Sequence, residues 1–141
     1  MIDFDFDNGM IYISDDLKIC PGFTFEEFRR SGLYDRRSSV EHICIKGMPE
    51  TQYVWLGEHL IGGVSYLVNL LFRGETIQIV SFVCCDRERD IGTGEERKAV
   101  HDLMLEKYDI FSEKSYDWGS VLSEHDPDTD FSSISITFFT G

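Results

Sequence analysis

The sequence is poor in basic residues, and this shortage excludes a first group of functions. It contains 13 Lys and Arg against 26 Asp and Glu, which gives a formal net charge of −13 at pH 7. Such a surface repels nucleic acids and anionic membranes and attracts basic partners. We therefore expect a protein that binds neither nucleic acid nor a membrane, although solubility alone would also account for an acidic surface.

Long apolar runs, targeting signals and CxxC motifs are missing as well. The sequence has no stretch of about 18 apolar residues, the length that spans a bilayer. The N-terminal MIDFDFDNG has neither the basic region nor the apolar region of a secretory signal. Cys20, Cys44, Cys84 and Cys85 form no CxxC spacing, the usual sign of a zinc or redox site. We expect four unpaired thiols, a cytoplasmic location and no cofactor.

The N-terminal residues have the pattern of a β-hairpin. IDFDFD and MIYIS alternate between apolar and polar residues on either side of Asn8-Gly9, which is typical of a two-residue type I′ turn. This turn would place Phe6 opposite Ile11 and Phe4 opposite Ile13. The residues predicted to share the buried face are Phe4, Phe6, Ile11 and Ile13.

A short helix is predicted directly after this hairpin. Thr24 and Glu27 have the spacing of a capping box, and Phe23 with Phe28 has that of a hydrophobic staple. Gly32 is a plausible end for the helix. Its aromatic side chains are expected to dock it on a sheet.

One long helix is predicted over residues 93–109, again with a capping box, formed by Thr93 and Glu96. His101 lies beside its apolar stripe, and a histidine in such a place is more often solvated or hydrogen-bonded than a ligand. The stripe at helical spacing consists of Val100, Leu103, Met104 and Tyr108.

Between and after the helices, the pattern is that of strands. Residues 40–47 and 52–57 alternate, as half-buried strands do, whereas 64–72 and 77–85 are almost continuously apolar, which is typical of central strands covered on both faces. Residues 115–139 form a last hairpin that turns at PDTD. The predicted core includes Phe4, Phe6, Tyr66, Val68, Leu70, Ile79, Phe82, Leu103 and Ile136.

The resulting order is ββ-α-ββββ-α-ββ. Runs of hairpins with two separate helices indicate an α+β fold with a mostly antiparallel sheet of about six to eight strands. At 141 residues the chain is long enough for its own core. No repeat or linker divides it, so residues 1–141 are expected to form a single domain.

The last turn, in SEHDPDTDFSS, gathers four carboxylates around His125. Its acids are spaced like the start of a calcium-binding loop, which also requires glycine at position 6 and glutamate at position 12. Counted from Asp126, these positions hold Phe131 and Thr137. A type I turn with Pro127 at its second position accounts for the segment, so we expect no metal site.

No catalytic residues are identifiable. Glu124, His125 and Asp126 are consecutive, so on a strand their side chains alternate between faces and cannot converge. The chain has no GxGxxG, P-loop or GxSxG motif. We therefore expect a protein that is not an enzyme.

Three segments resemble a group of small bacterial proteins. They are Tyr116–Thr137 with Trp118-Gly119 and Asp126-Pro127, the sequence PGFTFEEF at residues 21–28, and the run from Leu71 to Asp86. Several members of this group look like immunity proteins, which neutralise toxins by binding them. The resemblance implies no catalytic residues.

These observations together predict a non-enzymatic inhibitor that binds a basic toxin domain, for instance a nuclease. A small-molecule-binding or enzymatic domain and an adaptor protein are the alternatives. Exposed carboxylates are the natural contact groups for a basic partner. The predicted contact residues are Glu124, Asp126, Asp128 and Asp130 at the hairpin tip, followed by Asp15 and Asp16.

Overall fold

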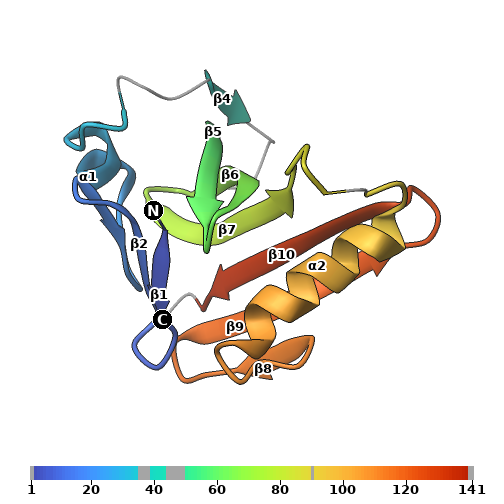
Figure 1. Cartoon of the computed structure of the whole chain (residues 1–141). Coiled ribbons are helices and arrows are strands. Elements are labelled where there is room, and N and C mark those ends of the chain that lie inside the picture. The colour runs from blue at the N-terminus through green and yellow to red at the C-terminus, as the bar shows by residue number, and fades with distance from the viewer. Residues whose placement is uncertain (1, 35–38, 44–49, 90, 140–141) are drawn as a thin grey trace.

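The structure is a computed structural model that describes residues 2–34, 39–43, 50–89 and 91–139, with only the backbone for 39–43. Figure 1 shows its elements. In chain order they are β1 (Asp3–Asp5), β2 (Met10–Ser14), β3 (Leu17–Ile19), α1 (Phe25–Arg29), β4 (Ser39–Ile43), β5 (Thr51–Ile61), β6 (Val64–Arg73), β7 (Thr76–Cys84), α2 (Gly94–Glu106), β8 (Glu113–Ser115), β9 (Gly119–Asp126) and β10 (Phe131–Phe138).

The strands form two antiparallel sheets, which confirms the predicted α+β fold with one short and one long helix. One sheet has the order β1-β2-β3, and the other has the order β4-β5-β6-β7-β10-β9-β8. The sequence predicted neither β3 nor β8. Each has three residues, which is too short for alternation to be recognised.

The two apolar runs are central strands, as predicted. β7 lies in the middle of the seven-stranded sheet, with β6 on one side and β10 on the other. The register of β6 and β7 shifts between Leu71, which pairs with Ile79, and Phe72, which pairs with Ile77. This bulge changes the alternation on β7, so Ile77 is buried and Ile79 is only half-buried, contrary to the prediction for Ile79.

Both helices and the three-stranded sheet lie on one face of the seven-stranded sheet. α2 packs against β7, β9 and β10. The ring of Phe4 meets that of Phe82 edge-on at 5.6 Å between centroids, and Phe28 of α1 lies 6.1 Å from Phe72. Of the predicted core, the buried residues are Phe4, Phe6, Tyr66, Val68, Leu70, Phe82 and Ile136.

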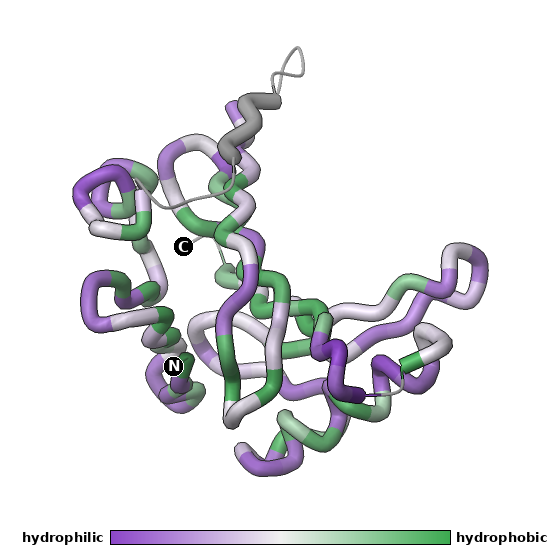
Figure 2. Tube along the Cα trace, turned by 45° about the horizontal axis from the view of Figure 1, so that its top comes forward, coloured by the Kyte–Doolittle hydropathy of each residue, from purple (hydrophilic) through white to green (hydrophobic). Residues whose placement is uncertain are grey.

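The prediction that the central strands are covered on both faces is wrong. Leu67 of β6 points away from the core and is 41% exposed, and Trp55 of β5 is 37% exposed. Leu71 and Val83 on the same face are half-buried. We call this second surface of the seven-stranded sheet the open face. In Figure 2, green and white positions make up most of the central strands, while purple positions gather in the turns.

The first hairpin has the predicted buried face but a different register. Phe4 pairs with Ile11 and Asp5 with Met10, so the loop spans four residues instead of two. Only Gly9 of the predicted turn pair has a positive φ, 68°. Trp118 explains the longer loop, because its indole Nε1–H donates to the Phe6 carbonyl at 2.7 Å and its ring lies where a Cβ on Gly9 would be.

The helix caps follow the prediction. The Thr24 hydroxyl accepts the Glu27 N–H at 3.2 Å, and the Thr93 hydroxyl accepts the Glu96 N–H at 3.1 Å. α1 stops at Arg29, however, before the predicted end at Gly32. Within the part of the chain that the structure describes, neither helix has the length and apolar character needed to cross a bilayer.

α2 is rotated relative to the predicted stripe. Leu103, predicted in the core, is 61% exposed, and His101 is fully buried in its place. His101 Nε2 accepts the Cys84 N–H at 2.9 Å, and Arg97 Nε donates to the Cys84 carbonyl at 3.0 Å. These two helical residues bind the backbone of Cys84 just beyond Phe82, the last β7 residue paired with β10. The need to satisfy this buried backbone accounts for the rotation.

Candidate partner-binding surface

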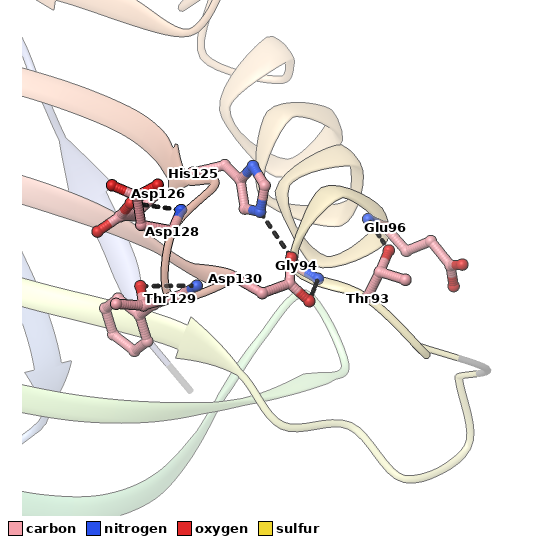
Figure 3. A network of polar contacts seen from close by, with 9 residues as sticks. Thr93, Gly94, Glu96, His125, Asp126, Asp128, Thr129 and Asp130 are labelled. Atoms are coloured by element: carbon pink, nitrogen blue, oxygen red, sulfur yellow. Dashed lines mark hydrogen bonds and ion pairs between the residues drawn. The ribbon is translucent and has the colours of Figure 1, made fainter.

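The acidic hairpin tip is built by its own polar side chains. β9 and β10 are joined by residues 127–130, as the sequence predicted. Asp126 Oδ1 accepts the Asp128 N–H at 2.9 Å, and the Thr129 hydroxyl accepts the Phe131 N–H at 3.3 Å (Figure 3). Such local bonds stabilise a turn without help from neighbouring elements. The tip therefore presents its carboxylates from a defined backbone.

Asp130 is engaged within the chain. Its Oδ2 accepts the N–H of Gly94 at the start of α2 at 3.0 Å, and its Oδ1 lies 2.7 Å from His125 Nε2 (Figure 3). The Gly94 N–H, and after it the His125 ring, hold the pKa of Asp130 below its ordinary value. A carboxylate at this end of a helix is also favoured by the helix dipole. Asp130 thus anchors the tip to α2.

The remaining tip carboxylates are exposed, and those of Glu124 and Asp126 belong to the open face. Along β9, Glu124 pairs with Ser133 and Asp126 with Phe131. Side chains two residues apart share a face, so both acids lie on the side that Leu122 also occupies, while His125 points to the α2 side. Asp128 is exposed in the turn itself.

Asp15 and Asp16 lie elsewhere. They form the exposed turn between β2 and β3, where the Asp16 N–H donates to the Ser14 hydroxyl at 3.2 Å. Figure 1 shows the three-stranded sheet and the β9–β10 tip on opposite sides of the molecule. The structure therefore does not bring the two predicted acidic patches together.

The open face supplies candidate contact residues that the sequence prediction missed. Its most exposed apolar side chains are Phe131, Leu60, Leu67 and Trp55, and the Trp55 ring lies 4.8 Å from that of Tyr53. The continuous apolar runs of β6 and β7 indicated this surface in the sequence, but they were interpreted as strands covered on both faces. By strand pairing, further apolar residues of this face are Leu71, Ile79, Val83 and Leu122.

Over ranges 2–34, 50–89 and 91–139, no group of three or more His, Cys, Asp or Glu is placed as metal ligands would be. Cys20, Cys84 and Cys85 are free thiols, and Cys44 lies outside the described residues. Surface hollows of about 240 to 340 Å³ are at or below the lower end of typical small-molecule sites.

His101 is fully buried in α2, and it lines none of the hollows just described. Burial, and after it the positive charge of Arg97, lowers the pKa of His101 to about 4. The ring is therefore neutral at pH 7, as its acceptance of the Cys84 N–H requires. The Cys84 N–H thus accounts for Nε2, whereas the buried Nδ1 has no hydrogen-bond partner.

Comparison with known proteins adds no relative. No family model matches the chain, and neither a curated protein nor a solved structure matches it significantly. The resemblance to immunity proteins thus stays a prediction, and function has to be inferred from the charge and shape of the surface.

Proposed function

We propose that the protein is a non-enzymatic inhibitor of the immunity type, which neutralises a basic toxin domain in the cytoplasm by binding it. One observation carries the proposal. The exposed carboxylates of Glu124, Asp126 and Asp128 border an apolar sheet face that is left open, on a chain with a net charge of −13.

Each part of this surface has a physical role in binding. Toxins that attack nucleic acids carry basic surfaces, since they must hold phosphates. An acidic inhibitor attracts such a surface over long distances, which raises the association rate at low salt. The apolar face then supplies area that is removed from water in the complex and slows dissociation.

Co-expression with a candidate toxin tests the proposal. The candidate is the product of the gene next to that of this protein, expressed in a sensitive host with and without the inhibitor. We expect the toxin to stop growth alone, and the inhibitor to restore survival and form a complex that weakens as salt rises. A neighbour that is harmless alone and forms no complex in low salt would overturn the proposal.

A matched pair of charge reversals separates local contact from bulk charge. Glu124→Lys and Glu106→Lys change the net charge equally, but Glu106 is exposed at the end of α2, away from the open face. We expect Glu124→Lys to lower the association rate about tenfold more than Glu106→Lys, with little change in dissociation. Equal effects would mean that only bulk charge matters. A bound neighbour that is not toxic would indicate an adaptor instead.

A further inference from the structure

The open face is large enough for a stable protein interface. Its five long strands, β5, β6, β7, β10 and β9, have 8 to 11 residues each. With strands about 4.8 Å apart and about 3.3 Å per residue, this part of the face measures roughly 700 Å². Specific complexes bury about 800 Å² on each partner. One partner could therefore cover the whole face.

The face has an apolar patch and carries more acids than bases. The patch consists of Trp55, Leu67 and Leu71 on β5 and β6, and a polar row of Asn69, Ser81 and Ser135 crosses the middle strands between Leu67 and Leu71. Among the described side chains of the strands, the acids Glu58, Glu124 and Asp126 lie toward the strand end near Cys85, Glu113 lies on the edge strand β8, and the base Arg73 lies at the opposite strand end. Apolar side chains next to charged ones are the usual anatomy of a protein interface.

A hollow of about 310 Å³ opens at one end of this face. Leu60, Ser65 and Cys85 line it from the strands and from the end of β7. Its charged lining consists of three carboxylates and one guanidinium, those of Glu58, Asp86, Glu88 and Arg87. Arg87 Nη2 lies 3.8 Å from Glu58 Oε1, in an ion pair whose members are 90% and 52% exposed. Exposed pairs of this kind are weak, so a partner's cation can compete for the carboxylates.

The charge pattern decides between a second copy and another protein. Two copies meeting through this face would each contribute four acids and one base among the described side chains, on a chain of net charge −13. Like charges facing each other across an interface cost several kcal/mol. A basic partner would instead meet these carboxylates with the opposite charge.

We infer that the open face is the docking surface for a basic protein, which rests on the proposed function. Aromatic or aliphatic side chains of the partner cover the apolar patch, and a Lys or Arg side chain enters the hollow lined by Glu58, Asp86 and Glu88. The hairpin tip lies at the same end of the sheet, across β7 and β10 from the hollow, where Glu124 and Asp126 contact further basic groups.

A phage-displayed library of random peptides is a suitable probe, because it requires no knowledge of the natural partner. We expect selection on the intact protein at low salt to enrich peptides that combine Lys or Arg with aromatic residues. Affinities of the enriched peptides are then measured by fluorescence anisotropy. Leu67→Ser and Glu58→Gln should each weaken binding about tenfold.

The controls carry the same substitutions on a different surface. Leu103→Ser and Glu106→Gln alter exposed residues of α2 and should leave affinity unchanged. Enrichment of no peptides, enrichment of peptides without basic residues, or binding insensitive to both open-face variants would overturn the inference.

Self-association and host survival complete the test. Sedimentation of the purified protein should show a monomer, and a dimer abolished by Leu67→Ser would assign the face to a second copy instead. If basic peptides bind the face but the protein protects no host from the neighbouring toxin, the immunity proposal fails and the docking surface stands. If the Leu67→Ser variant protects and binds the toxin as well as the wild type does, the docking surface fails and the immunity proposal stands.

Discussion

On β6 and β7, both faces of the seven-stranded sheet carry large apolar side chains, but these side chains have different neighbours. On β7, Phe82 is fully buried beneath the three-stranded sheet, while the adjacent Val83 points to the open face and is half-buried. A large apolar side chain on a strand therefore does not by itself distinguish a face that folds the chain from one that is available to a partner. The two faces are distinguished by the elements packed on them, and the following substitutions test this difference.

The largest expected effect compares neighbours on opposite faces. Phe82→Ala should lower the free energy of unfolding by about 3–5 kcal/mol, because it leaves a cavity against Phe4 and α2. Val83→Ala should cost less than about 1 kcal/mol, since the residue remains in contact with water. Urea denaturation of both variants measures this, and equal losses would show that the open face is also a core.

The second effect concerns how α2 is held on the covered face. With its pKa near 4, His101 stays neutral in the fold while the unfolded chain binds a proton near pH 6.5. The contribution of neutral His101 to the free energy of unfolding is thus complete above pH 6.5. It falls by up to about 3 kcal/mol as the pH is lowered from 6.5 to 4.

The slope of stability against pH should accordingly be smaller in His101→Gln, which has no titratable ring but keeps an acceptor for the Cys84 N–H. His59→Gln controls for the removal of one histidine. An unchanged slope in His101→Gln would assign the pH dependence to other groups.

The third effect is local to the junction of the tip and α2. A Cβ on Gly94 would collide with the Asp130 carbonyl and lie 2.7 Å from the His125 ring, whereas one on Gly92 would make ordinary contact with Glu96 at 3.8 Å. Gly94→Ala should therefore destabilise the fold by about 1–3 kcal/mol. Gly92→Ala should change stability by less than about 0.5 kcal/mol. Thermal unfolding of the pair is the measurement, and equal melting temperatures would contradict the close approach.

The smallest effect is expected on the open face itself. Leu67→Ser should change the free energy of unfolding by less than about 1 kcal/mol, because Leu67 is 41% exposed in the free protein. Leu103→Ser on the outer side of α2 should behave alike. A large loss for Leu67→Ser alone would mean that another part of the chain covers this face.

Local chemistry made much of the fold predictable. The caps at Thr24 and Thr93 and the turn after Asp126 depend on residues within four positions of one another, and each was found where the sequence placed it. The loop of the first hairpin was not predictable in this way, because it depends on Trp118, which lies 112 residues from Phe6 in the sequence. The orientation of α2 likewise depends on the backbone of Cys84.

The candidate site likewise has residues that were predictable from the sequence and residues that were not. The exposed acids of the hairpin tip were identifiable from composition and turn chemistry. Asp130 was grouped with them, although Gly94, 36 residues earlier, holds its carboxylate. The apolar part of the surface was missed because a continuous apolar strand has the same pattern whether one face is covered or both are.

The position of β10 has a consequence for the chain during its synthesis on the ribosome. β7 pairs with β10, although α2, β8 and β9 separate the two strands in sequence. Until residue 138 has left the ribosome, β5, β6 and β7 can pair, but β7 remains a long apolar edge strand with unpaired backbone groups. The nascent protein is therefore most prone to aggregation between the emergence of β7 and its pairing with β10, and a chaperone that binds apolar strand edges should act on it in that interval.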